Sequence, residues 1–146
     1  MSNEPFPPPS EPSLFSRIIA GDLPGRFVWR DAAGPDAVVA FLTIAPIRPG
    51  HVLVVPVAQI DQWTDLPPSV WARVTEVSQR IGAVLGDLFE CERVALLIAG
   101  LEVPHCHVHL VPIRTEADLS FALADTGASS QDLDAAAAQI SEALAS

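Results

Sequence analysis

Apolar residues recur along the chain at spacings that predict three helices. After Ser13 they follow helical spacing until Gly21 and Pro24, which predicts a short helix with one apolar face. A long helix is expected after Asp65, which is placed to cap its start. Its apolar stripe follows steps of three and four residues: Val70, Val74, Val77, Ile81, Val84 and Leu88. An alanine-rich segment predicts a closing helix with its apolar positions at Leu133, Ala136, Ala137, Ile140 and Leu144.

Five other stretches have the composition of β-strands: 27–30, 37–42, 51–56, 93–98 and 103–113. The short, turn-rich links between the first three favour a meander, and the tight connection at 99–102 favours a hairpin of the last two. We therefore expect an α+β fold. It has an antiparallel sheet of about five strands with the helices on one side.

The chain divides into three segments. Residues 1–12 contain five prolines among small and acidic residues and are expected to form a flexible tail. Residues 13–117 are expected to form the single domain, with a C-terminal extension at 118–146 whose helix packs on it. A chain of 146 residues is long enough for one such core.

The charge balance excludes several classes of partner. The chain has 18 acidic residues against 8 arginines and no lysine, giving a formal net charge of -10. Binding to nucleic acids or to anionic membranes depends on clustered basic residues, so neither is expected. Two cysteines, Cys91 and Cys106, without a signal peptide or a long apolar segment, fit a protein of the reducing cytoplasm.

Three of the four histidines stand at alternate positions, His105, His107 and His109, and the fourth is His51. Residues two apart in a strand share one face of the sheet, so the three imidazoles are expected side by side. His51 opens the third predicted strand, where a loop meets the core. One residue type repeated on one face indicates a functional site rather than a solvated surface.

Two kinds of chemistry suit such a row. A metal site could not use all three, because about 13 Å would separate the Cα atoms of His105 and His109, and zinc needs nitrogens within about 2.0 to 2.1 Å. Two of these histidines together with His51 remain feasible ligands. The other possibility is nucleophilic attack on phosphorus by an imidazole, for which the middle residue, His107, is best placed.

Residues 105–111 match the histidine triad signature His-φ-His-φ-His-φ-φ, in which φ is an apolar residue. Further matches are residues 14–19 followed by Pro24, residues 40–44 followed by Pro46, and residues 49–56. In this order, over roughly residues 13–113, the chain resembles the histidine triad (HIT) family. Its members are hydrolases and transferases that act on nucleotide α-phosphates.

This resemblance implies a two-layer α+β fold, a homodimer, and chemistry that needs no metal or other cofactor. It implies that His107 is the covalent nucleophile and that His105, His109 and His51 line the same site. It also implies an apolar slot for the base, formed by Phe15, Ile18, Phe41, Ile44 and Leu53.

The chain departs from the family pattern at positions that would contact the nucleotide. Thr43 stands where many members have an aspartate that holds the ribose hydroxyls. The loop before the triad is shortened and carries Leu101 and Glu102, so a carboxylate replaces the hydroxyl residue expected beside phosphate, and Val103 and Pro104 follow it. Thr43, Glu102 and Val103 complete the candidate substrate-binding residues. A CxxC zinc motif found in some bacterial members is replaced by the segment from Ser13 to Ser16.

The sequence thus predicts a hydrolase or nucleotidyl transferase that forms a nucleotidyl-histidine intermediate at an α-phosphate. Its substrate would be a nucleotide or nucleotide conjugate, cleaved as a phosphoramidate, an acyl adenylate or a dinucleoside polyphosphate. Two alternatives stay open: a HIT-fold nucleotide-binding protein with weak or no hydrolysis, and a histidine-ligated metal enzyme.

Overall fold

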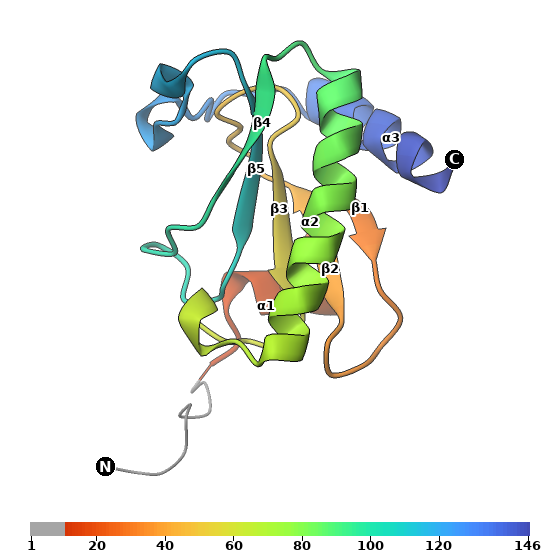
Figure 1. Ribbon diagram of the computed structural model, residues 1–146, viewed down its shortest axis with the longest axis vertical. Coiled ribbons are helices and arrows are strands. Elements are labelled where there is room, and N and C mark those ends of the chain that lie inside the picture. Colours follow the sequence, from red (N-terminus) through yellow and green to blue (C-terminus); the bar gives the residue numbers. More distant parts are fainter. Residues whose placement is uncertain (1–10) are drawn as a thin grey trace.

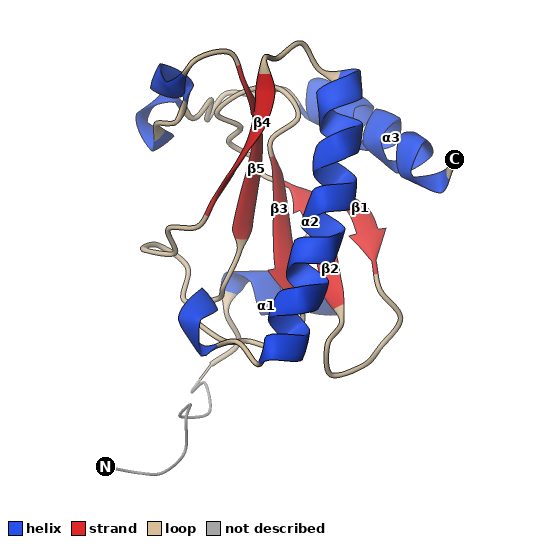
Figure 2. Cartoon of the chain, viewed as in Figure 1, coloured by secondary structure: helices blue, strands red, loops and turns tan. Residues whose placement is uncertain are grey.

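The computed structural model describes residues 11–146, so most of the proline-rich tail predicted at 1–12 lies outside the described residues. The rest of the chain folds into five strands, three α-helices and three short 3-10 helices, labelled η (Figures 1 and 2). They are α1 (Leu14–Ala20), β1 (Phe27–Arg30), β2 (Val38–Leu42), β3 (Val52–Pro56), η1 (Trp63–Asp65), α2 (Pro68–Leu88), β4 (Arg93–Leu97), β5 (Val108–Ile113), η2 (Glu116–Asp118), η3 (Phe121–Leu123) and α3 (Ser130–Ala145). Within residues 11–146, no helix has both the length and the apolar character needed to cross a membrane.

The strands form one sheet in the order β1-β2-β3-β5-β4, and every neighbouring pair is antiparallel. The predicted meander of the first three strands and the predicted pairing of the last two are therefore confirmed. Register brings Leu53 of β3 opposite His109 of β5. Because directly paired residues share a face, the histidine lies on the same side of the sheet as Leu53.

The two faces of the sheet bury different apolar clusters. Residues Val38, Ala40 and Leu42 of β2 pack with α2 and α3, whereas the intervening Val39 and Phe41 pack on the other face. This alternation follows from the period of two in a strand, and it makes all five residues of β2 buried.

Helix α2 covers one face of the sheet with the predicted stripe, but its ends differ from the prediction. Pro67 precedes the helix and no side chain caps it, because Asp65 belongs to the short helix η1. At the other end Leu85 is buried, whereas Leu88 is 37% exposed. Leu85 follows Ile81 by four residues, whereas the predicted Val84 follows it by three. The buried stripe is therefore shifted by one residue near the end of the helix.

The expectation that the helices lie on one side of the sheet is wrong for α1. Its Phe15 packs with Phe41 and Leu53, on the face opposite to α2. In Figure 1 α2 lies in front of the sheet and α1 behind it. The seven-residue α1 is held there mainly by Phe15, its buried residue, and Ile18 and Ile19 pack partly buried against the same cluster. The histidine face is thus partly covered rather than open.

Strand β5 begins at Val108, five residues later than expected. Pro104 has no N–H to donate, and the N–H groups of His105 and Cys106 donate to the carbonyls of Val103 and Ile60 instead of to β4. The last pair between β4 and β5 is Leu97 with His109. His105 and His107 therefore lie in the connection that enters β5, and only His109 lies in the strand itself.

Candidate active site

All four histidines are buried on the α1 side of the sheet. Phe15 contacts two of them edge to face, with ring centroids 5.9 Å from His105 and 4.8 Å from His107. The rings of His107 and His109 are 4.9 Å apart, and those of His109 and His51 are 5.2 Å apart. The structure thus brings together the four histidines predicted from the sequence, although two of them precede the strand.

His105 is fixed by hydrogen bonds on both ring nitrogens. Its Nε2 lies 2.7 Å from the carbonyl oxygen of Pro56, so this nitrogen carries the proton and donates. Its Nδ1 then accepts from the hydroxyl of Ser13 at 2.7 Å. Ser13 is also the N-cap of α1, where its Oγ accepts from the N–H of Ser16. With both ring nitrogens engaged in hydrogen bonds and the ring fully buried, neither nitrogen of His105 has a free lone pair.

His107 is held on one side only. Its Nδ1 lies 2.7 Å from the carbonyl oxygen of His105 and donates to it. That bond fixes the proton on Nδ1 and leaves Nε2 with its lone pair, which is the state a nucleophile requires. His107 is 7% exposed, so this residue is not completely enclosed.

His51 and His109 form a chain of hydrogen bonds that starts at the backbone. The N–H of Ile47 donates to Nδ1 of His51, so Nε2 of His51 carries a proton and donates to Nδ1 of His109 at 2.9 Å. The proton of His109 must then lie on its Nε2. His109 therefore carries an N–H donor in a ring whose centroid lies 4.9 Å from that of His107.

Burial keeps these imidazoles neutral. Desolvation lowers the pKa of His51 to about 4, with a further effect of the nearby His107. Desolvation also lowers the pKa of His109 to about 3, helped by His51 and His107. The pKa of His107 is lowered by desolvation too, although its hydrogen bond to His105 and the carboxylate of Glu102 act in the opposite direction. Neutral rings suit a row of donors and lone pairs.

Five of the predicted substrate-binding residues form one apolar cluster beside the histidines. Phe15, Phe41 and Leu53 are buried in it, and Ile18 and Val103 pack against it while partly exposed. Phe15 and Phe41 meet edge to face with their centroids 5.5 Å apart. Because the first three side chains fill the space between α1 and the sheet, Ile18 and Val103 form the accessible rim of this cluster.

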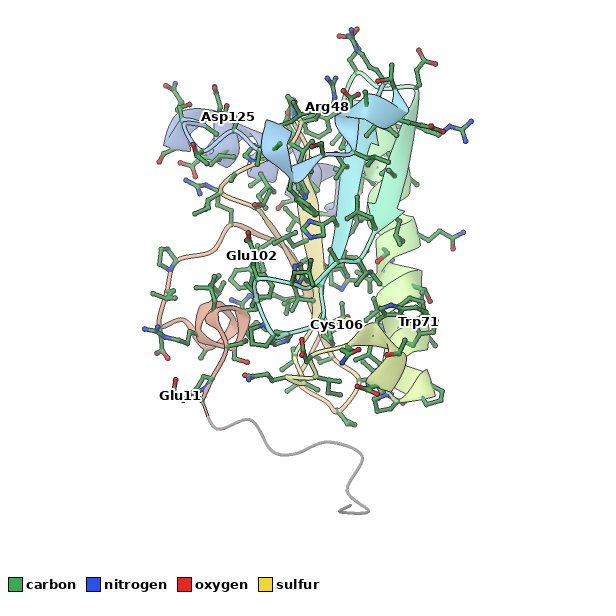
Figure 3. All side chains as sticks on the ribbon, turned by 90° about the vertical axis from the view of Figure 1, so that its left-hand side faces the viewer. Glu11, Arg48, Trp71, Glu102, Cys106 and Asp125 are labelled. Atoms are coloured by element: carbon green, nitrogen blue, oxygen red, sulfur yellow. The ribbon has the colours of Figure 1, made fainter. Side chains whose placement is uncertain are left out.

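The other three predicted residues lie apart from that cluster. Ile44 is 74% exposed and joins neither apolar cluster of the described residues on this face. Thr43 is half-buried, and its Oγ1 accepts a hydrogen bond from the N–H of Ala45. Glu102 is exposed on the connection from β4 to β5, and Figure 3 shows it between the levels of Arg48 and Cys106.

Sequence reasoning missed the groups that orient the histidines. The carbonyl of Pro56 and the N–H of Ile47 are backbone groups, which carry no signature of their own. Ser13 stood out only as part of a lost zinc motif, although a serine before an apolar helical run indicates an N-cap. Phe121 was also missed. Its ring lies edge to face on His109 with the centroids 5.0 Å apart, and it comes from a segment that reads as polar.

The hydrogen-bonded ring nitrogens of this site have backbone groups, a serine or one another as partners. Among residues 11–146, no three His, Cys, Asp or Glu side chains are placed to share a metal ion. At the start of α1, the hydroxyl of Ser16 donates to the side-chain Oε1 of Gln59 at 2.7 Å and lies 3.4 Å from Nδ1 of His105. The segment that replaces the CxxC motif therefore takes part in hydrogen bonds among serines, a glutamine and a histidine.

The fold and this site define a histidine triad protein. The model of the HIT domain matches residues 32–116. An uncharacterised HIT-like protein of Methanocaldococcus jannaschii is 31% identical over 112 residues, which cover 72% of this chain and 81% of the relative. The chain therefore belongs to the HIT family, and the resemblance found in the sequence is confirmed.

Two further relatives connect the chain to known proteins. The asymmetrical bis(5'-nucleosyl)-tetraphosphatase of Schizosaccharomyces pombe is 36% identical over 86 residues, which cover 56% of this chain but only 47% of the relative. A Zn-bound histidine triad family protein of Mycobacterium smegmatis has a crystal structure that superposes with a TM-score of 0.74. It is 27% identical, and the match covers 90% of this chain and 92% of that one. The α+β fold with its five-stranded antiparallel sheet is thus shared.

Proposed function

We propose that this protein is a nucleotide hydrolase or nucleotidyl transferase that acts at an α-phosphate through a nucleotidyl intermediate on His107. The observation that carries the proposal is the hydrogen bond from Nδ1 of His107 to the carbonyl oxygen of His105. It leaves Nε2 as a free base in a mostly buried site. The tetraphosphatase activity of the fission yeast relative supports a nucleotide substrate.

The reaction needs two displacements at phosphorus. In the first, the lone pair on Nε2 of His107 forms a bond to phosphorus while the bond to the leaving group breaks and takes its electron pair away. In the second, water attacks the same phosphorus, the nitrogen–phosphorus bond breaks, and the nucleoside monophosphate is released. The proton lost by that water goes to solvent, and solvent supplies the proton that the leaving group takes up.

His109 assists as a hydrogen-bond donor rather than as an acid. With its pKa lowered to about 3, its ring is neutral in the free protein at ordinary pH. The Nε2–H can still donate to the departing atom, as a neutral imidazole does when it polarises a reacting group. His51 and the N–H of Ile47 keep that proton in place through Nδ1 of His109.

The base would contact the rim of the apolar cluster, at Ile18 and Val103, over the buried Phe15, Phe41 and Leu53. The hydroxyl proton of Thr43 is available to donate to a ribose oxygen, because the contact with Ala45 uses only the acceptor capacity of Oγ1. The exposed Ile44 would reach the nucleotide only from outside this cluster.

One observation favours the alternative, a nucleotide-binding protein with weak or no hydrolysis. Glu102 is close enough to His107 to act on its pKa, so its negative charge also acts on a phosphate bound there. Like charges repel, and this would raise the energy of a bound anion. Replacing Glu102 by glutamine separates the two functions: an enzyme would turn over faster, whereas a binding protein would only bind more tightly.

Turnover of a nucleoside phosphoramidate tests the proposed function. The wild-type protein should release adenosine monophosphate from adenosine 5′-phosphoramidate, and His107→Ala, folded normally by circular dichroism, should release none above background. Equal turnover by His107→Ala would overturn the assignment of the nucleophile. Absence of turnover by the wild type, with binding retained, would establish the alternative.

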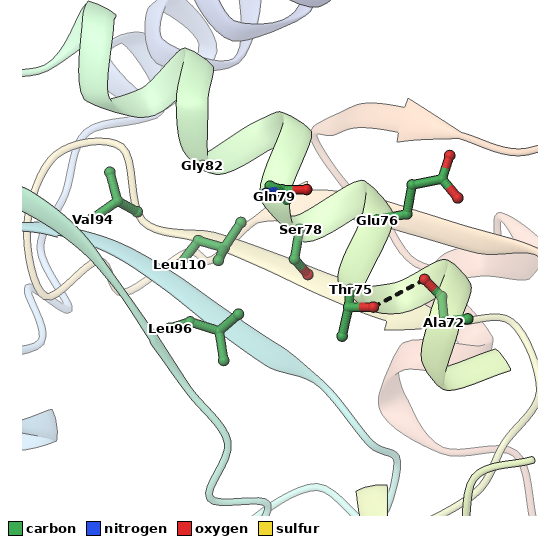
Figure 4. Close-up of a pocket in the computed structure, with 9 residues that line it drawn as sticks. All are labelled: Ala72, Thr75, Glu76, Ser78, Gln79, Gly82, Val94, Leu96 and Leu110. Atoms are coloured by element: carbon green, nitrogen blue, oxygen red, sulfur yellow. Dashed lines mark hydrogen bonds between the residues drawn. The ribbon is translucent and has the colours of Figure 1, made fainter. Parts of the chain in front are cut away.

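We also propose that the chain forms a homodimer through β4 and α2. β4 is an edge strand and presents unpaired backbone groups, and its Leu96 is 52% exposed. Beside it lies a hollow of about 680 Å³ between α2 and the strands, lined by Thr75, Ser78 and Leu110 among others (Figure 4). The buried Oγ of Ser78 has no hydrogen-bond partner within residues 11–146.

Sedimentation equilibrium tests this assembly. Leu96→Arg should convert a dimer into a monomer, and Leu14→Arg, an equally exposed position on α1, should not. A wild-type monomer at micromolar concentration would contradict the proposal.

The cytoplasmic location expected from the cysteines stays a prediction.

A further inference from the structure

The segment that follows β5 places a large aromatic side chain on the candidate active site. Phe121, in η3, meets the ring of His109 with centroids 5.0 Å apart and ring planes at 62°. Its side chain is nevertheless 50% exposed. One part of the ring therefore covers the histidine that holds the donor N–H, and the rest is open to whatever lies beside it.

Both ends of this segment are fixed to the domain. At its start the carboxylate of Asp118 accepts from the backbone N–H groups of Arg114 and Thr115, at 2.8 Å and 3.2 Å. At its end the N–H of Asp125 donates to the carbonyl oxygen of Pro46 at 2.9 Å. The segment between these two anchors contains η2 and η3. It holds Phe121 over His109.

Leu119, two residues before Phe121, adds apolar surface that is 40% exposed, and the arginines near the start of this segment are occupied. Arg114 pairs with Glu90, and Arg48 donates to the carbonyl oxygen of Pro112 and lies 4.0 Å from Asp118. A departing polyphosphate would need free positive charge at this place, whereas an apolar group would gain contact with the exposed ring.

We propose that Phe121 determines specificity for the leaving group, by favouring substrates whose leaving group carries an aromatic or similarly apolar part. This inference rests on the proposed function, because it takes the departing atom to lie at Nε2 of His109. The ring contacts the apolar part of the leaving group as it sits beside His109. The apolar part of the leaving group changes neither His109 nor the reacting phosphorus.

Two substrates that differ only in a phenyl ring test the proposal: the adenosine 5′-phosphoramidates of 2-phenylethylamine and of ethylamine. Wild-type protein should have the larger kcat/KM for the phenyl substrate, mainly through a lower KM. Phe121→Ala should reduce this preference by about two-fold to tenfold, the range expected for loss of one aromatic pair. Phe121→Trp should retain it, since the indole offers a similar face.

Leu123→Ala is the matched control, because Leu123 is exposed to a similar extent in the same short helix. It should leave the preference unchanged. A general loosening of the segment would slow both substrates equally, so the ratio separates specificity from a structural role. A ratio that is near one in the wild type, or that is the same in Phe121→Ala, overturns this inference while the proposed function stands. Failure of the wild type with both substrates overturns the two together.

Discussion

Nε2 of His51 donates a hydrogen bond to Nδ1 of His109 across 2.9 Å, and this bond connects the loop before β3 to the start of β5. The residues are 58 positions apart in the chain. The bond has a direction because the N–H of Ile47 occupies Nδ1 of His51. A single backbone amide thus determines on which nitrogen His109 carries its proton.

Removing that donor should weaken departure of the leaving group. His51→Leu leaves Nδ1 of His109 without its partner, so the donor N–H is no longer held in place. We expect kcat to fall by about a hundredfold, the lower part of the range for loss of one hydrogen-bond donor to a transition state. The loss should be greater for a poor leaving group than for a good one.

His51→Gln is the matched variant, because its side-chain amide keeps an N–H donor. It should recover a measurable part of the rate. Steady-state kinetics with two phosphoramidates of different amine basicity would check both variants. An equal loss for both leaving groups in His51→Leu would refute the role given to this bond.

Ser13 should contribute to stability through His105. Ser13→Ala removes the donor to Nδ1 of a fully buried ring and the cap of α1. A buried group left unpaired costs about 1 to 3 kcal/mol, so the free energy of unfolding should fall by about that amount. Urea denaturation of Ser13→Ala and Ser16→Ala would measure it. Ser16 lies farther from His105, at 3.4 Å, and its loss should cost less.

Stability should decrease as the pH falls through the weakly acidic range. The pKa of His51 is lowered to about 4 and that of His109 to about 3, from 6.5 in the unfolded chain. Between pH 6.5 and these values the unfolded state binds more protons, so acid favours unfolding. Each unit of lowered pKa corresponds to about 1.4 kcal/mol. Urea denaturation at pH 7, 6, 5 and 4 would follow this loss.

His109→Gln supplies the control for the pH series. It removes one of the two titrations, so its free energy of unfolding should depend less steeply on pH than that of the wild type. Equal slopes for the two proteins would show that His109 is not a source of the effect.

Gly50 should tolerate no side chain. Its φ of 90° lies in the left-handed region, and a Cβ there would stand 2.7 Å from Cδ2 of Phe89. Gly100 has a φ of 75° with nothing within 4 Å of the same position. Both alanine variants carry the backbone strain, but only Gly50→Ala adds the clash. Its unfolding free energy should be lower by a further amount of about 1 to 3 kcal/mol.

Thermal or urea unfolding of the two variants would give this difference directly. Because Gly50 precedes His51, Gly50→Ala should also lower turnover, whereas Gly100→Ala should affect stability alone. Equal destabilisation of the two would mean that the ring of Phe89 moves aside at no cost.

The fold could be predicted from sequence because the apolar residues of its strands and helices recur at regular spacings. The alternation in β2 and the stripe from Val70 to Ile81 are local patterns that tertiary packing does not override. The start of β5 was harder to predict. Residues 103–107 look like strand, but Pro104 and the side-chain bonds of His105 take them out of the ladder. That outcome depends on contacts with residues far away in the chain.

The histidines of the candidate site could be identified from the sequence. Which nitrogen of each ring carries the proton could not. Which ring nitrogen is free follows from the carbonyls of Pro56 and His105 and from the N–H of Ile47. Such groups exist at every position of every chain, so only the fold reveals which of them a ring meets. Phe121 lay outside the motif for the same reason, since its place over His109 is a tertiary contact.

The proposed function depends on a bond between Nε2 of His107 and the α-phosphorus. Rapid mixing with adenosine 5′-phosphoramidate, followed by an alkaline quench and mass spectrometry of proteolytic peptides, tests it most directly. We expect an adenylyl group on the peptide that contains His107, formed and lost at rates that match turnover, and absent from His107→Ala. Turnover without any adduct in the wild type, or an adduct on another residue, would contradict it.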